Sequence, residues 1–131
     1  MRNYNSKRGI LIIEENEEVR LLLKDFMKEE GYIIDSADDG SEALEKLVRK
    51  AFDLVITDIQ IPGLRGLDIL PHLKKYQPDV SIIVISAFGG ERASVRAFER
   101  GATAYIKKPI DLQALKTLIH DLIPPGGICS N

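Results

Sequence analysis

The sequence predicts an α/β fold, a doubly wound parallel sheet of five strands with five helices on its two faces. Short apolar runs alternate with stretches of helical periodicity along the chain, and strict strand–helix alternation implies parallel strands joined by right-handed crossovers. The chain has 131 residues, of which 44% are hydrophobic and 29% are charged. This is the length of one domain and the composition of an ordinary globular protein.

The five apolar runs are too short for helices and rich in Ile and Val, which favours strands. They cover residues 10–13, 32–37, 54–57, 82–85 and 104–106. The first, third and fourth runs are continuously apolar, as expected of central strands that are covered on both faces. The second contains polar residues and the fifth is very short, so both are predicted to be edges. These assignments predict the strand order 2-1-3-4-5.

The helices are predicted from apolar residues that recur every three or four positions. Asn16 is the predicted N-cap of the first helix, Asp39 that of the second and Asp111 that of the fifth. Asp39 has the spacing of a capping box with Glu42, and Pro71 weakens the third helix because it lacks a backbone N–H. The apolar positions are Val19, Leu22, Leu23 and Phe26; Ala43, Leu44, Leu47 and Val48; Leu70 and Leu73; Ala93, Ala97 and Phe98; and Leu112, Leu115, Ile119 and Leu122.

Charge and cysteine content limit the function classes. The chain has 18 basic and 20 acidic residues, so direct nucleic-acid binding is not expected. No run of 18 apolar residues appears, and the first eight residues lack the apolar stretch of a signal peptide, so no membrane association is expected. Cys129 has no partner for an intrachain disulfide, which favours a reducing compartment, and a cytoplasmic location is predicted.

One domain is predicted over residues 8–123. Two prolines and two glycines follow it directly, from Pro124 to Gly127, and would end the last helix. The flanking segments 1–7 and 124–131 are expected to be flexible, the second as a tail or the start of a linker.

Polar residues end four of the predicted strands. Glu14 and Glu15 follow the first strand, Asp58 the third, Ser86 the fourth and Lys108 the fifth. Ligands of an open parallel sheet bind beyond the carboxyl ends of its strands, where the winding reverses, so the three carboxylates should converge there. Two carboxylates about 4 Å apart repel by roughly 4 kcal/mol at an effective dielectric of about 20, and either the lysine or a cation such as Mg²⁺ must offset this. Taken singly, each residue also fits a structural role, such as an acid at a helix N-terminus.

The motifs around these residues form a specific combination. They are the acidic pair Glu14-Glu15, the stretch Asp58-Ile-Gln-Ile-Pro62-Gly63-Leu-Arg-Gly66, the pair Ser86-Ala87, and Tyr105-Ile-Lys-Lys108-Pro109. With them the chain resembles the receiver domain of two-component response regulators, over about residues 8–123. The resemblance implies a flavodoxin-like fold and a cis Lys108–Pro109 peptide bond.

The resemblance also implies a role for each matching residue. Asp58 would be the phosphoacceptor, and Lys108 would pair first with Asp58 and then with the phosphoryl oxygens. Ser86 would move to bond the phosphoryl group, and the Tyr105 ring would turn inward with it. The ligands of Mg²⁺ would be Glu14, Glu15, Asp58 and the backbone carbonyl of Gln60.

The implied function is two-component signal transduction. A sensor histidine kinase or phosphotransfer protein would phosphorylate Asp58, and the change would switch partner binding through helix 4, strand 5 and helix 5. The chain would catalyse only its own phosphotransfer and dephosphorylation, and would not be an enzyme with a free substrate. Its other partners would be a downstream protein or fused output domain and a second copy in a homodimer.

Three alternatives follow from the same residues. The family usually carries Asp at one or both positions of the acidic pair, whereas both are Glu here. This favours a degenerate receiver that binds partners without phosphorylation, while the presence of Asp58, Ser86 and Lys108 argues against it. A flavodoxin-like electron carrier would need a Ser/Thr/Gly-rich phosphate loop after the first strand, where this chain has Glu14 and Glu15. A phosphatase with its nucleophilic Asp at the end of the first strand is excluded, because no Asp stands there.

Overall fold

The computed structural model describes residues 8–59, 68–87 and 91–125. Within these ranges, five parallel strands form one sheet in the order β2-β1-β3-β4-β5, which confirms the predicted fold class and strand order. Each predicted run differs from its strand by no more than one residue at either end. The strands are β1 (Gly9–Ile13), β2 (Ile33–Ala37), β3 (Leu54–Asp58), β4 (Ser81–Ser86) and β5 (Ala104–Lys107).

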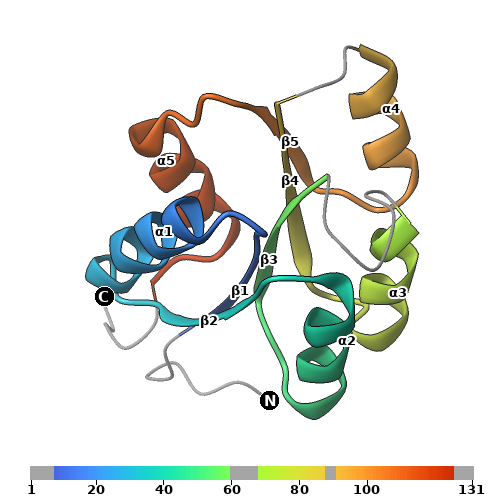
Figure 1. The fold of residues 1–131 in the computed structure, drawn as a ribbon, viewed down its shortest axis with the longest axis horizontal. Coiled ribbons are helices and arrows are strands. Elements are labelled where there is room, and N and C mark those ends of the chain that lie inside the picture. The colour runs from blue at the N-terminus through green and yellow to red at the C-terminus, as the bar shows by residue number, and fades with distance from the viewer. Residues whose placement is uncertain (1–7, 60–67, 88–90, 126–131) are drawn as a thin grey trace.

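The helices form two layers around the sheet. Those at the ends of the chain, α1 (Glu17–Glu29) and α5 (Leu112–Leu122), cover one face. The other face is covered by α2 (Gly40–Arg49), α3 (Ile69–Tyr76) and α4 (Glu91–Glu99) (Figure 1). The segments expected to be flexible, 1–7 and most of 124–131, lie outside the described residues.

Alternate side chains of each strand point into two separate cores. In β1, Leu11 and Ile13 pack with α2, α3 and α4, while Ile10 and Ile12 pack with α1 and α5. All four side chains are buried, because a central parallel strand is covered on both faces. Successive side chains of a strand point to opposite faces of the sheet, so this alternation fixes which residues of each strand reach each layer.

Side-chain caps begin three helices, as predicted. The side chains of Asn16, Asp39 and Asp111 accept hydrogen bonds of 2.8 to 3.1 Å from backbone N–H groups in the first turns of α1, α2 and α5. The Glu42 carboxylate accepts a bond from the N–H of Asp38, the residue before the cap. The second half of the predicted capping box is therefore displaced by one residue.

Some apolar residues of the predicted helix stripes are not in the core. Leu22 is 53% exposed, Val48 62% and Phe98 50%, whereas neighbouring stripe residues such as Leu23 and Ala97 are fully buried. Helical periodicity identifies the side of a helix that carries apolar residues, but the packed layer covers only part of that side. These three side chains lie at its margin, facing solvent.

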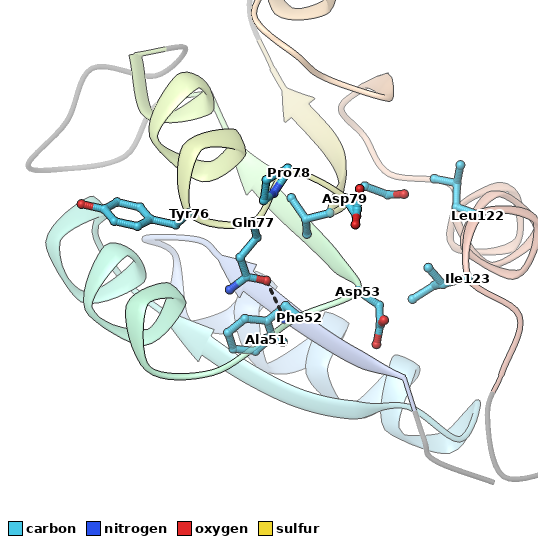
Figure 2. Close-up of a pocket in the computed structure, with 11 residues that line it drawn as sticks. Ala51, Phe52, Asp53, Tyr76, Gln77, Pro78, Asp79, Leu122 and Ile123 are labelled. Carbon is cyan, nitrogen blue, oxygen red and sulfur yellow. Dashed lines mark hydrogen bonds between the residues drawn. The ribbon is translucent and has the colours of Figure 1, made fainter. Parts of the chain in front are cut away.

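A polar network closes the opposite edge of the sheet, where the strands begin. Gln77 follows α3 and joins it to the segment before β3: its Oε1 accepts from the N–H of Phe52 at 2.7 Å (Figure 2). The Nε2 of Gln77 donates to the carbonyls of Leu47 at 2.9 Å and Lys50 at 2.7 Å. A cavity of about 490 Å³ opens beside these residues, on the side of the sheet away from the predicted site.

Candidate functional site

Three charged side chains of the predicted site meet at the carboxyl edge of the sheet. Glu14 follows β1, Asp58 is the last residue of β3, and Lys108 follows β5. The backbone N–H of Glu14 donates to the carbonyl of Ala37 at the end of β2, at 3.0 Å. The backbone N–H of Lys108 donates to the carbonyl of Ser86 at the end of β4, at 2.8 Å. The pairing of the sheet thus continues into the loops that carry the site.

Lys108 bridges the two acids. Its Nζ lies 2.6 Å from Asp58 Oδ2 and 3.4 Å from Glu14 Oε1. The ammonium group offsets the repulsion between the carboxylates, which is one of the two alternatives predicted. The three side chains carry a formal charge of −1, so the pocket can accept a further cation. The Lys108–Pro109 peptide bond is cis, as the resemblance implied.

The acids are more buried than the lysine. Glu14 is 5% exposed and Asp58 8%, while the side chain of Lys108 is 24% exposed. Partial burial lowers the pKa of the Lys108 ammonium, but the hydrogen bond and charge of Asp58, with those of Glu14, raise it further, so the net pKa lies above its usual value. Lys108 therefore stays charged at neutral pH.

The start of α1 fixes the Glu14 carboxylate. Its Oε2 accepts a hydrogen bond from the N–H of Asn16, at 3.0 Å, and Asn16 in turn caps α1 through the N–H of Val19. From the first turns of α1, Arg20 Nη1 donates to the carbonyls of Glu14 at 2.8 Å and Glu15 at 3.3 Å. Arg20 was not predicted from the sequence; its only signal is a basic residue one helical turn after an acidic loop.

Ser86 and Tyr105 lie on neighbouring strands next to this pocket. Ser86 ends β4 and is fully buried. Tyr105 is opposite Val84 in the β4–β5 pairing, two residues before Ser86, so the side chains of Ser86 and Tyr105 point to the same face of the sheet. Tyr105 is partly buried and packs against the core on the side of α2, α3 and α4.

Two of the predicted metal ligands are not gathered with the rest. The side chain of Glu15 is exposed, and Gln60 lies outside the described residues. In the ranges that the structure describes, no group of three or more His, Cys, Asp and Glu side chains is placed to hold a metal ion. Glu14 and Asp58 nevertheless supply buried carboxylate oxygens to one pocket, and this hard donor set fits Mg²⁺ or Ca²⁺.

Comparison with known proteins decides the family. The model of the response regulator receiver domain matches residues 10–120. The chain belongs to this family of receiver domains. Sporulation initiation phosphotransferase F of Bacillus subtilis is 30% identical to this receiver, over 88% of this chain and 93% of that protein. The transcriptional regulator NtrC of Azospirillum brasilense is 34% identical over 94% of this chain, but the match spans only 26% of NtrC.

A solved structure of a response regulator is also similar to this chain. A response regulator from Burkholderia pseudomallei, solved with a phosphorylated aspartic acid, a calcium ion and citrate, is 25% identical to this receiver. It superposes with a TM-score of 0.80 over 84% of this chain and 65% of that one. Membership of the receiver family sets aside the electron-carrier alternative, which rested on the shared fold alone.

A membrane-spanning helix needs about 20 consecutive, mostly apolar residues. None of the helices in the described ranges has the length and apolar content of a membrane span.

Proposed function

We propose that this receiver is a phosphorylation-operated switch that takes a phosphoryl group from a sensor histidine kinase or a phosphotransfer protein onto Asp58. The observation that carries the proposal is the Asp58 carboxylate, almost buried yet held at 2.6 Å by a charged lysine at the winding reversal of the sheet. Ligands of open α/β sheets bind at this place.

The chemistry needs a positioned nucleophile and fixed positive charge. A carboxylate oxygen of Asp58 attacks the phosphorus of a phosphohistidine; the new O–P bond forms as the P–N bond breaks, and the histidine nitrogen leaves with the electron pair and is then protonated. Lys108, already 2.6 Å from Asp58 Oδ2, is placed to contact the phosphoryl oxygens. The product is an acyl phosphate, whose hydrolysis resets the switch. The protein thus acts only on itself.

A divalent cation, Mg²⁺ in this proposal, would be held by Glu14, Asp58, Glu15 and the carbonyl of Gln60. When bound, it would neutralise charge on the equatorial phosphoryl oxygens. Glu14 has the most settled place in this set, because both its carboxylate oxygens have hydrogen-bond partners in the pocket. Glu15 would have to turn inward from its exposed position.

The proposed signal passes through Ser86 and Tyr105. The phosphoryl group brings new acceptor oxygens, and the Ser86 hydroxyl at the end of β4 is a candidate donor to them. A shift of the loop after Ser86 would move α4, and Tyr105 on the same sheet face would follow. We propose that the surface of α4, β5 and α5 is thereby switched between two partner-binding states.

An apolar groove beside Lys108 supports docking of a helical partner. It has a volume of about 250 Å³ and is lined by Val19 and Leu22 of α1, Lys108, and residues 109, 110 and 112. Leu22 is half exposed at this place, so an amphipathic helix that buried it would lie next to the pocket of Asp58. A helix that carries a phosphohistidine has the required form.

A phosphorylation-independent interaction domain is the second candidate function, and the specific observation in its favour is the exposed side chain of Glu15.

The test that separates the two candidates is incubation of the protein with Mg²⁺ and acetyl phosphate, followed by intact-protein mass spectrometry. We expect one added phosphoryl group on the wild type and none on Asp58→Asn. Absence of modification in the wild type would favour the second candidate, and modification of Asp58→Asn would place the phosphoacceptor elsewhere.

Requirement for the cation is tested in the same assay. Removal of Mg²⁺ with a chelator should abolish uptake by the wild type, whereas uptake that is unchanged would contradict the proposed metal role of Glu14 and Glu15. A homodimer, an output domain and a cytoplasmic location stay predictions.

A further inference from the structure

Arg20 holds two consecutive peptide groups of the loop that carries the acids. Its Nη1 donates to the carbonyl of Glu14 at 2.8 Å and to that of Glu15 at 3.3 Å. It reaches them from the first turns of α1, whose start is itself fixed by the Asn16 cap. The loop between β1 and α1 is therefore tied from the helix side as well as from the strand.

One of these peptide groups also carries a contact of the pocket. The carbonyl of Glu15 and the N–H of Asn16 belong to the same peptide unit, which is planar and trans, so their directions are opposite and coupled. Arg20 binds the carbonyl, and the N–H donates to Glu14 Oε2 at 3.0 Å. A rotation of this unit would break both hydrogen bonds at once.

The two peptide groups flank the α-carbon of Glu15. Fixing both of them sets the direction of its Cα–Cβ bond, and the Glu15 side chain is the one proposed ligand that must turn inward. Arg20 thus acts on both acids: on Glu14 through the Asn16 N–H, and on Glu15 through its backbone. The side chain of Arg20 is partly buried. Partial burial restricts its rotamers and so helps to keep the guanidinium group at the two carbonyls.

We propose that Arg20 is a positioning residue, which orients the Glu14 and Glu15 carboxylates toward the pocket of Asp58. This inference deepens the proposed function: the effect of Arg20 on metal binding rests on the proposed role of Glu14 and Glu15 as metal ligands. Arg20 does not contact reacting atoms in this assignment. It acts through the backbone of the acidic loop, in the manner of outer-shell groups that orient metal ligands.

The first test is amide hydrogen exchange by NMR on Arg20→Met, without metal or phosphodonor. We expect exchange at the Asn16 amide to be faster by about tenfold, as for the loss of one hydrogen bond. The Gln113 amide is an internal control, because it also donates at 3.0 Å to a side-chain carboxylate two residues before it, at the start of α5. Its exchange should not change. Arg49→Met, at an exposed site in the last turn of α2, controls for the loss of an arginine charge.

The second test is Mg²⁺ binding by calorimetry. Arg20→Met should bind Mg²⁺ about tenfold more weakly than the wild type, Arg49→Met should bind as the wild type does, and Arg20→Lys should recover part of the affinity because an ammonium can donate to one of the two carbonyls. A merely structural role in α1 would lower the urea midpoint without changing the affinity of the folded protein.

The outcomes separate this inference from the proposed function. Unchanged Asn16 exchange in Arg20→Met would overturn the positioning role. Faster exchange with unchanged Mg²⁺ affinity would reduce Arg20 to a support of the α1 cap and would also overturn it. Neither the exchange measurement nor the Mg²⁺ titration needs phosphorylation, so together they decide the role of Arg20 even if the wild type takes up no phosphoryl group, a result that would overturn only the proposed function.

Discussion

The ammonium of Lys108 lies 2.6 Å from Asp58 Oδ2, although 50 residues separate them along the chain. The same nitrogen is 3.4 Å from Glu14 Oε1. Lys108 therefore holds the ends of β1, β3 and β5 together at one edge of the sheet. This contact belongs to the proposed site and also contributes to folding, so its removal should affect both.

Lys108→Met is expected to destabilise the protein by about 1–3 kcal/mol at neutral pH, because two nearly buried carboxylates lose their shared donor. Urea unfolding measures this. Lys107→Met is the matched control, since the neighbouring lysine is exposed and its removal should change stability by less than about 0.5 kcal/mol. Equal losses in the two variants would contradict the bridging role.

The contribution of Lys108 to the free energy of unfolding should decrease at alkaline pH. Its pKa in the folded protein is raised above the ordinary value of 10.5, so its contribution is complete below 10.5 and is lost as the pH rises through the folded value. The difference between the wild type and Lys108→Met should accordingly be constant from pH 7 to 9 and shrink above 10.5. A difference that grows in this range would show that the sign is wrong.

Tyr32 gives a second alkaline signal, on the other side of the molecule. Its hydroxyl donates to the carbonyl of Ile123 at 2.7 Å, and burial, assisted by the charge of Glu30, raises its pKa to about 12. In the unfolded chain the Tyr32 hydroxyl ionises near pH 10. The wild type should therefore lose stability between pH 10 and 12. Tyr32→Phe should be less stable by about 1 kcal/mol at neutral pH but should lose less stability than the wild type over this pH range, as followed by thermal unfolding. Tyr76→Phe, at a half-exposed site, should behave as the wild type at every pH.

Two glycines allow strain and crowding to be separated. Gly31 and Gly101 both have positive φ, 95° and 109°, a region that disfavours a Cβ by about 1–2 kcal/mol. A Cβ at Gly31 would meet nothing within 4 Å, whereas one at Gly101 would lie 3.0 Å from Cγ of Lys74. Gly31→Ala should therefore show the strain alone, and Gly101→Ala should unfold at lower urea. Combination with Lys74→Ala should remove the excess, and an excess that persists would implicate another contact.

Gln77 is expected to stabilise the fold through the three hydrogen bonds of its side chain. Gln77→Ala removes the acceptor for Phe52 N–H (Figure 2) and the donor to the carbonyls of Leu47 and Lys50, and should cost about 2–3 kcal/mol in urea unfolding. Gln113→Ala, at an exposed position in α5, serves as the control with an effect below about 0.5 kcal/mol. A loss for Gln77→Ala no larger than for Gln113→Ala would mean that water replaces these bonds without penalty.

The strand order and the edge of the sheet that carries the site could be predicted because they follow from rules that act on runs of residues. Continuous apolar runs identify central strands, and the carboxyl ends of adjacent parallel strands meet at one edge. This rule placed Asp58 and Lys108 at that edge, the resemblance implied that they pair, and they lie 2.6 Å apart. The caps Asn16, Asp39 and Asp111 were predicted for the same reason, since each lies at a boundary between two patterns.

Arg20 and Gln77 could not be found in this way. Each binds backbone carbonyls, and since every residue carries a carbonyl, no partner residue type marks the contact in the sequence. The exposure of Phe98 and Val48 was missed for a related reason. Periodicity places an apolar residue on one side of a helix, and only the tertiary packing determines whether another element reaches it.

The two cores of the sheet have no member in common. Substitutions separated by the backbone of β1, β3 and β4 should combine additively in their effect on folding, since they share no packing partner. Over evolutionary time, residues of the layer formed by α2, α3 and α4 can then change while the layer formed by α1 and α5 is kept. Substitutions in one layer need no compensating substitutions in the other. Of the surface proposed to switch, α4 belongs to the first layer and α5 to the second, so the two sides of that surface can change independently.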